Sequence, residues 1–149
     1  MPANSAERNE RIIASFRSHG GDVPLENFGK RLILLHHCGN VSGREYVTPL
    51  VALRDDEDTW FIAASAGGTE RHPAWYLNLT ARPRTTIETP DGVESVSVID
   101  LDEPERSQAW AKFESPLHNV EHANFRSYQE RTSRTIPVVA LRRATEVPS

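Results

Sequence analysis

The chain has 149 residues, a net charge of -4 and a single cysteine, Cys38. This length suffices for one domain with a hydrophobic core, so we expect residues 1–149 to fold as a single domain. The acidic balance gives no reason to expect nucleic acid as a partner. A lone cysteine cannot form an internal disulfide and suits a reducing compartment. The longest aliphatic run, Leu32–Leu35, is far too short to cross a membrane, so we expect a cytoplasmic protein.

Residues 1–21 are predicted to form an N-terminal helical arm. Asn4 and Glu7 have the spacing of a capping box, and a pair of glycines ends the arm. Ile12 and Phe16 are four residues apart and therefore share one face of the helix. Two partners stay open for this apolar face. We favour docking on the rest of the protein, because the face is small; the alternative is peripheral contact with the inner face of the membrane.

Six strands are predicted after the arm, from apolar and β-branched segments that turn residues separate. They cover Lys30–Cys38, Glu45–Arg54, Thr59–Ala64, Thr85–Glu88, Val93–Leu101 and Ile136–Leu141. Pro49 lies inside the second strand and indicates an edge position or a bulge, because proline cannot donate to a ladder.

Helices are predicted between the strands, at Pro73–Ala81 and Leu117–Thr132 and in a segment that Ser115-Pro116 ends. Asp102 and Glu105 have the spacing of a capping box for this middle helix. Strands in meanders with helices set between them favour the α+β class, with the sheet closed as a barrel to avoid open edges.

The segment from Gly39 to Leu79 carries the features that indicate a ligand. Two glycine-bearing loops each follow an apolar segment, and the second leads into the helix that Pro73 opens. Small residues before a helix N-terminus offer backbone N–H groups and the positive end of the helix dipole, which together can hold a phosphate. Trp75 and Tyr76 would supply an aromatic wall, or else simply pack in the core. We interpret the segment as the site of a flat, phosphate-bearing cofactor.

Histidines offer further candidates, which we weigh against plainer roles. His118 and His122 fit the H-x-x-E-H zinc pattern, but a solvated helix face is the better interpretation and no metal is expected. His36 and His37 point to opposite faces of their strand and cannot act as a pair. One of them could line the pocket, although a buried, hydrogen-bonded structural role is favoured. Cys38 is expected to be a small buried hydrophobe rather than a reactive thiol.

Taken in order, these segments resemble the deazaflavin-dependent nitroreductase family, the split β-barrel oxidoreductases that use reduced coenzyme F420. The resemblance is carried by Arg11-Ile12-Ile13, Phe16-Arg17, Gly20-Gly21, Ser42-Gly43-Arg44, Tyr46-Val47-Thr48-Pro49-Leu50, Ala64-Ser65-Ala66-Gly67-Gly68, His72-Pro73-Ala74-Trp75-Tyr76-Leu77-Asn78-Leu79, Tyr128-Gln129, Arg131-Thr132 and Arg134-Thr135-Ile136-Pro137-Val138-Val139. It implies a split β-barrel of about six mostly antiparallel strands, with an N-terminal helix and further helices packed on the barrel.

The resemblance also implies an activity. Proteins of this kind transfer a hydride from the deazaflavin to electron-poor acceptors, here quinones, nitroaromatics or unsaturated carbonyl compounds. The partner would therefore be a small hydrophobic electron acceptor, and because such barrels often pair, a homodimer is expected. The cofactor supplies the hydride and the protein supplies position and a dry cleft.

Site residues follow from the same resemblance. The cofactor contacts would be Asn40, Val41, Ser42, Arg44, Tyr46, Ala63, Ala64, Ser65, Ala66, Ala74, Trp75, Tyr76, Leu77, Asn78 and Phe125. Ser65 and Tyr128 are the polar residues expected at the reacting centre.

The chain departs from the family pattern in its charges. The family often has basic residues where this chain has Asn40 and Val41, in some members another at Tyr46, and a lysine at Ala66. Each lost charge-assisted hydrogen bond would weaken binding by about 1.5–3 kcal/mol. Two alternatives therefore stay open beside the F420H2-dependent reductase. One is a non-catalytic split barrel that holds a cofactor, a fatty acid or another hydrophobic ligand, and the other is an FMN-dependent reductase on the same fold.

Overall fold

The computed structural model describes residues 2–24, 28–39, 42–64, 72–114, 129–130, 132 and 134–144. Its elements are α1 (Pro2–Ser18), β1 (Leu32–Cys38), β2 (Glu45–Val51), β3 (Leu53–Asp56), β4 (Thr59–Ala63), α2 (Ala74–Ala81), β5 (Arg84–Thr89), β6 (Gly92–Asp100), α3 (Glu105–Glu114) and β7 (Val138–Arg143). The strands form one antiparallel seven-stranded sheet in the order β2-β1-β5-β6-β7-β4-β3. The predicted helix Leu117–Thr132 falls almost entirely outside the described residues.

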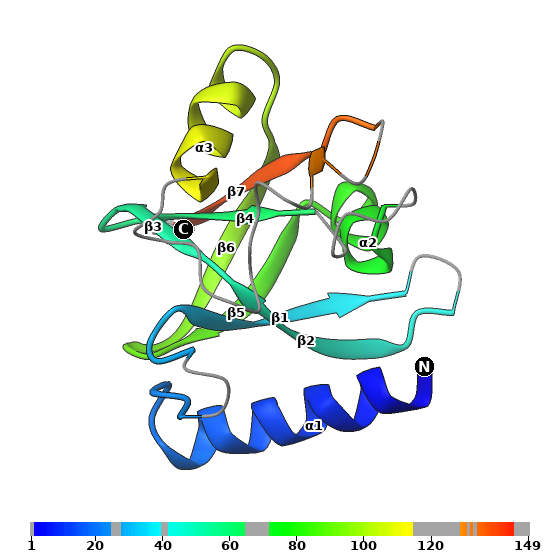
Figure 1. Cartoon of the computed structure of the whole chain (residues 1–149), viewed down its shortest axis with the longest axis vertical. Coiled ribbons are helices and arrows are strands. Elements are labelled where there is room, and N and C mark those ends of the chain that lie inside the picture. The colour runs from blue at the N-terminus through cyan, green and yellow to red at the C-terminus, as the bar shows by residue number, and fades with distance from the viewer. Residues whose placement is uncertain are drawn as a thin grey trace, which may run out of the picture.

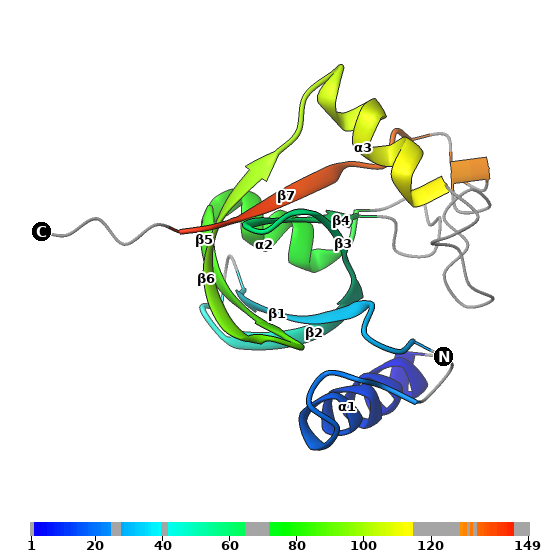
Figure 2. The same ribbon diagram turned by 90° about the vertical axis from the view of Figure 1, so that its left-hand side faces the viewer.

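The sheet curls round on itself because its two end strands are consecutive in the chain (Figures 1 and 2). Only Ala52 separates β2 from β3, and its N–H donates to the carbonyl oxygen of Arg31 at 2.9 Å. The segment predicted as one strand, Glu45–Arg54, is therefore two strands on opposite ends of the sheet. Pro49 lies in the end strand β2, as its missing N–H predicts. The predicted α+β split barrel is confirmed, with seven strands instead of about six.

The interior of the barrel is filled by inward-facing strand residues and by α2. Ile33 and Leu35 of β1 pack there with Trp75 and Leu79 of α2, and all four are at most 6% exposed. Side chains alternate along a strand, so Leu32 and Leu34 face outward. They are buried too, which is why the sequence shows an unbroken apolar run there.

The outer face of β1 is covered by α1 (Figure 2). Ile12 and Phe16 are 2% and 4% exposed and pack with Leu32 and Leu34. Arg17 adds a two-pronged ion pair to Glu88 of β5, at 3.1 and 2.7 Å. The predicted docking of the arm on the protein is thus what the structure has. No helix in the described part of the chain is long and apolar enough to cross a membrane.

Two helix starts differ from the predicted capping boxes. Helix α1 already begins at Pro2, so Asn4 lies inside it and is not its N-cap. At α3 the capping carboxylate belongs to Glu103 and not to Asp102: the N–H and hydroxyl of Ser107 donate to Glu103 Oε1 at 3.0 and 2.6 Å. Asp102 instead accepts from the N–H of Arg106 through its backbone carbonyl. Several neighbouring acidic residues left the sequence ambiguous about which one caps.

Candidate functional site

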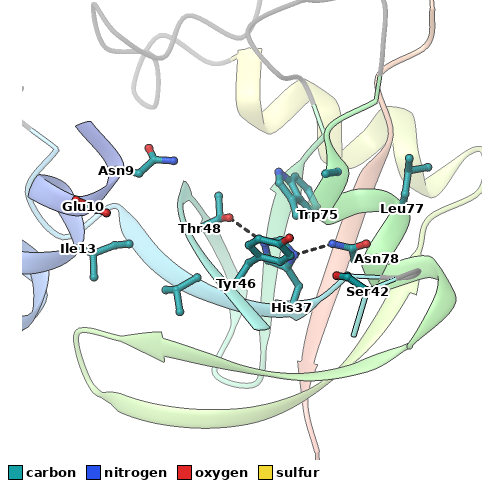
Figure 3. A pocket seen from close by; sticks show the side chains of 13 residues that line it. Asn9, Glu10, Ile13, His37, Ser42, Tyr46, Thr48, Trp75, Leu77 and Asn78 are labelled. Atoms are coloured by element: carbon teal, nitrogen blue, oxygen red, sulfur yellow. Dashed lines mark hydrogen bonds between the residues drawn. The ribbon is translucent and has the colours of Figure 1, made fainter. Parts of the chain in front are cut away.

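A cleft of about 810 Å³ opens between α1, the strands β1 and β2, and α2. Figure 3 shows the α1 residues on one side of it, the α2 residues on the other, and the strand residues between them. Its lining comprises Asn9, Glu10, Ile13, His37, Gly39, Ser42, Tyr46, Val47, Thr48, Ala74, Trp75, Leu77 and Asn78. The cleft therefore lies where the N-terminal arm passes the open edge of the barrel.

A buried histidine joins the two sides of the barrel mouth at this cleft. His37 of β1 accepts a hydrogen bond at Nδ1 from Asn78 Nδ2 of α2, at 2.9 Å. Its Nε2 lies 2.9 Å from Thr48 Oγ1 of β2. The ring of Tyr46 stacks on it, with centroids 5.5 Å apart and an interplanar angle of 23°. His37 is thus held on three sides by residues of the cleft (Figure 3).

Burial disfavours the charged form of the His37 imidazole. Burial lowers its pKa below the ordinary value, and the neighbouring His36 lowers it further. Asn78 is itself only 8% exposed, so neither partner of this contact is well solvated. His37 therefore has both of the roles considered from the sequence: it lines the pocket, and it is a buried, hydrogen-bonded residue.

The walls of the cleft are largely apolar. Ile13 and Val47 contribute from α1 and β2, and Trp75 and Leu77 from α2. Leu77 is 51% exposed and Tyr46 42%, unusual values for large apolar side chains. Trp75 is only 6% exposed and belongs to the barrel core, so it lines the cleft and packs in the interior at once. Such a surface suits a flat, hydrophobic ligand.

The start of α2 supplies the polar end of the cleft. Its N-cap, Pro73, makes no side-chain capping bond and has an extended backbone, with φ -65° and ψ 151°. The N–H of Tyr76 turns back to the carbonyl oxygen of Pro73, while Ala74 and Trp75 precede it with the first N–H groups of the helix. First-turn N–H groups have no partner within a helix. Among the described residues, no backbone carbonyl accepts from the N–H groups of Ala74 and Trp75, whereas the N–H of Ala64 donates to the carbonyl oxygen of Pro137.

The first glycine loop is bonded to itself where it is described. The N–H of Gly39 donates to the carbonyl oxygen of Arg44 at 2.8 Å, and that of Gly43 donates to Gly39 at 2.9 Å. The N–H of Arg44 is taken by Ser42 Oγ at 3.2 Å. Gly43 has a φ of +69°, which explains the glycine there. These amides hold the loop in shape and are not available to a ligand.

The structure brings together six of the predicted cofactor contacts at this cleft. They are Ser42, Tyr46, Ala74, Trp75, Leu77 and Asn78. Four others, Arg44, Ala63, Ala64 and Tyr76, are described but are not part of its lining. The remaining predicted site residues, Asn40, Val41, Ser65, Ala66, Phe125 and Tyr128, lie outside the described residues.

Those four residues have other surroundings. Ala63 and Ala64 are buried in the two packing layers on either side of β4. Tyr76 donates its hydroxyl to Asp100 Oδ2 at 2.6 Å. Burial raises the pKa of Tyr76 to about 12, and the bond to Asp100 contributes in the same direction. Arg44 is exposed in the loop.

Several cleft residues were missed by the reasoning from sequence. Asn9, Glu10 and Ile13 of α1 line the cleft, although the arm was expected to dock on the protein or to contact the membrane and not to line a pocket. Ile13 sits beside the buried Ile12–Phe16 pair, so a second, half-buried stripe was the available hint. Thr48 follows from strand alternation, since it shares the inward face of β2 with Tyr46.

The electrostatics of the cleft lean acidic. Glu10 is the only charged side chain among the described residues of the lining. No group of three histidine, cysteine, aspartate or glutamate residues comes together in the described part of the chain. The H-x-x-E-H motif at His118–His122 lies outside it. The described cleft thus offers a helix N-terminus for an anion and no metal-binding cluster.

Fold and cleft together define a split-barrel protein with a largely apolar cleft. A family model described as F420H(2)-dependent quinone reductase matches residues 9–143. This protein therefore belongs to the F420H(2)-dependent quinone reductase family, and the resemblance predicted from its sequence is confirmed. The enzyme class expected from that resemblance, an F420H2-dependent oxidoreductase, is the class that the family description gives.

Individual relatives agree with the family. An F420H(2)-dependent quinone reductase of Mycobacterium tuberculosis is 38% identical over 115 residues, which cover 74% of this chain and 72% of that protein. The solved structure of an F420-H2 dependent reductase (FDR-A) superposes with a TM-score of 0.63 and 27% identity, covering 75% of this chain and 94% of the other. A domain-swapped dimer superposes with a TM-score of 0.65, covering 95% of this chain and 99% of the other; at 24% identity it shows the fold alone.

Proposed function

We propose that this protein transfers a hydride from reduced coenzyme F420 to a quinone. Nitroaromatic and unsaturated carbonyl compounds are further acceptor classes within the proposal. The observation that carries it is the apolar cleft beside the uncapped N-terminus of α2, in a chain that belongs to a family described by this reaction. When bound, the deazaflavin supplies the hydride, so the protein needs only to position two rings and exclude water.

The described residues fit a flat ring that carries a phosphate. Tyr46, Trp75 and Leu77 give the cleft aromatic and aliphatic walls. The first N–H groups of α2, at Ala74 and Trp75, together with the positive end of the helix dipole, would bind the phosphate. Gly39 lets the loop side of the cleft pack closely on itself, because a Cβ there would lie 2.5 Å from Ser42 Oγ. These residues would bind and orient the cofactor.

The other predicted contacts complete the proposal. We assign the reacting centre to Ser65 and Tyr128, and the cofactor and substrate sides to Asn40, Val41, Ala66 and Phe125, on the family resemblance alone. Arg44, Ala63, Ala64 and Tyr76 stay in the proposal as secondary contacts, since a ligand can extend beyond the described cleft. Pairing into a homodimer and a cytoplasmic location, with or without membrane contact, also stay predictions.

One observation favours a second candidate, a split barrel that binds a hydrophobic ligand without turnover. The described lining of the cleft has no lysine or arginine, and its one charged side chain, Glu10, would repel the phosphate and the acidic tail of F420. A fatty acid or a neutral ring would meet no such need for basic residues. The relatives reported above are named for F420H2, and the FMN alternative has no support from them.

Titration of the protein with oxidised F420, FMN and FAD tests the proposal, followed by mixing with F420H2 and menadione. We expect tight binding of F420 alone and oxidation of F420H2 that depends on menadione. A deazaflavin without the phosphate tail separates the two contributions, since it should bind more weakly if α2 holds the phosphate. Oxidation no faster than without protein, with a fatty acid found by native mass spectrometry, would instead establish the second candidate.

Charge at the cleft mouth gives a matched control. Glu10→Gln removes the repulsion and should tighten F420 binding about 2–5-fold at low salt, the size of a solvent-exposed charge interaction. Glu7 lies one turn earlier on α1, is exposed and does not line the cleft, so Glu7→Gln should leave the affinity within about twofold. Equal effects of the two substitutions would mean that F420 does not bind beside Glu10.

A further inference from the structure

The hydrogen bonds around His37 have a direction. An amide NH2 group only donates, so the contact from Asn78 Nδ2 makes His37 Nδ1 the acceptor. A neutral imidazole then carries its proton on Nε2. This N–H points at Thr48 Oγ1, 2.9 Å away, and makes the hydroxyl an acceptor in that contact. The order along the chain of bonds is Asn78 to His37 to Thr48.

This order leaves the hydroxyl hydrogen of Thr48 for another acceptor. Among the described residues, Thr48 Oγ1 has no contact that would accept it. Thr48 lines the cleft and is half-buried, between the ring of Tyr46 and the α1 wall (Figure 3). Burial lowers the pKa of His37, which favours a neutral ring, and the contact with Asn78 Nδ2 selects its tautomer. Because the N–H of His37 occupies a lone pair of Thr48 Oγ1, the hydroxyl hydrogen of Thr48 is available to an acceptor in the cleft.

We propose that Asn78 and His37 orient the Thr48 hydroxyl as a hydrogen-bond donor into the cleft, where it binds a carbonyl oxygen of the ring ligand. This rests on the proposed function for the nature of the ligand, because both a deazaflavin and a quinone carry ring carbonyls. In an apolar cleft, one directed donor fixes which way a flat ring lies. Thr48 is then a binding residue, and His37 and Asn78 are positioning residues that act through it.

The tautomer of His37 is the first test and needs no ligand. Nitrogen-15 NMR of histidine-labelled protein at pH 7.5, with His37→Phe to assign the resonances, should show a neutral ring protonated at Nε2. A ring protonated at Nδ1 would make the Thr48 hydroxyl donate to the histidine and would overturn the proposal. A doubly protonated ring overturns it as well, since Asn78 could then not donate to Nδ1.

Binding is the second test. Thr48→Val keeps the shape and removes the hydroxyl, so it should weaken the binding of oxidised F420 or of menadione by about 2–10-fold, the range for one net hydrogen bond. Thr48→Ser keeps the hydroxyl and should bind within about twofold of wild type. The ligand that responds is the one whose carbonyl Thr48 contacts. Unchanged affinity for both ligands in the valine variant, with its unfolding midpoint preserved, overturns the proposal.

A double-mutant cycle tests that His37 acts through Thr48. His37→Phe should weaken binding of the responding ligand in the wild-type background and change it less than twofold in the Thr48→Val background. Equal losses in both backgrounds overturn the positioning role. If the wild-type protein binds menadione but not F420, the proposed cofactor is wrong. The affinities of wild type and the Thr48 variants for menadione then decide this inference. Binding of neither ligand overturns both.

Discussion

The two faces of β1 use the same residue type in opposite ways. On the outer face, His36 Nε2 lies 2.7 Å from Glu88 Oε2, in a network that Arg17 of α1 completes, and 38% of the His36 side chain is exposed. On the inner face, His37 is 7% exposed and bonded to the neutral Asn78 and Thr48. One step along the strand thus separates an ionic, partly solvated environment from a neutral, buried one.

This difference predicts which contacts matter for stability. Exposed ion pairs contribute little, about 0–1 kcal/mol, so α1 is held on the outer face mainly by its buried Ile12 and Phe16. A buried polar chain behaves differently, because a group left without its partner keeps the cost of lost solvation. Disturbing close packing outside, or the hydrogen-bond chain inside, should therefore cost more than disturbing the ion pairs.

Close packing at the end of α1 gives the largest expected effect. Gly21 has a φ of +92°, and a Cβ there would lie 2.6 Å from Pro90 Cα in the β5–β6 turn. Gly21→Ala should lower the free energy of unfolding by about 2–5 kcal/mol through backbone strain and overlap. Urea unfolding followed by circular dichroism measures it.

Its neighbour is the matched control. Gly20 has a φ of +62° but nothing within 4 Å of an added Cβ, so Gly20→Ala should cost only the left-handed strain, about 1–2 kcal/mol. The difference between the two variants isolates the contact with the β5–β6 turn. If the alanine variants are equally stable, the outer face does not depend on that close approach.

The two histidines are compared directly by the next substitution. His37→Leu removes the buried ring that Asn78 Nδ2 and Thr48 Oγ1 contact at 2.9 Å and should lower the free energy of unfolding by about 1–3 kcal/mol. His36→Leu removes an exposed contact and should change it by less than about 1 kcal/mol. Urea unfolding at pH 7.5 checks both, and a larger loss at His36 would reverse the roles assigned to the two faces.

Much of this arrangement follows from local sequence patterns. The unbroken run Leu32–Leu35 predicts a strand buried on both sides, and it is covered by α1 outside and by the barrel core inside. Pro49 predicts the edge position that β2 occupies. The opposite directions of His36 and His37 follow from the two-residue period of a strand. These features depend on neighbours in the chain, so one sequence was enough to predict them.

Other features depend on contacts between distant segments and were beyond local patterns. The bend at Ala52, which divides one predicted strand between two ends of the sheet, is stabilised by a bond to Arg31. Helix α1 lines the cleft because of how it crosses the barrel, so Glu10 carried no sign of this role and Ile13 only its place beside the buried Ile12–Phe16 pair. Tyr76 belongs to the sequence pattern of the family and was therefore predicted to contact the cofactor. Packing of α2 against the core decides which of its residues line the cleft, and Tyr76 is not one of them.

Measuring stability as a function of pH tests the difference between the two faces of β1, because Glu88 on the outer face and His37 on the inner face affect the free energy of unfolding in different pH ranges. The pKa of Glu88 is lowered by Arg17 first and His36 less, and that of His37 by burial. Both folded-state values lie below the unfolded ones, so the folded protein binds fewer protons and loses stability as pH falls. The His37 contribution begins to be lost below about pH 6.5 and the Glu88 contribution below about pH 4.5.

Two variants separate these windows. In urea unfolding across pH 3–8, Glu88→Gln should weaken the dependence below about pH 4.5 without abolishing it, because the pKa values of Asp56 and Glu103 are also lowered, and should keep the upper dependence. His37→Leu should weaken the upper dependence, part of which His72 retains, so its deficit relative to wild type should shrink as pH falls below about 6.5. A His37→Leu curve parallel to wild type across the upper window would contradict a neutral, buried His37.

The smallest expected effect on stability concerns Tyr76 of helix α2. Within one turn of this helix, Trp75 and Leu77 line the cleft, while the hydroxyl of Tyr76 donates to Asp100 outside it. The pKa of Tyr76 is raised to about 12, chiefly by burial, so the folded value lies above the unfolded one of 10.0. The contribution of its hydroxyl is therefore complete below pH 10 and is lost as pH rises from 10 toward 12. Tyr76→Phe should cost about 0.5–1.5 kcal/mol at pH 8. This cost should shrink progressively as pH rises from 10 toward 12, because only the wild type must then keep a phenol protonated in order to fold. Thermal unfolding at pH 8 and pH 11 measures the change, and a deficit that stays constant would mean that Tyr76 ionises as freely in the folded protein as in the unfolded chain.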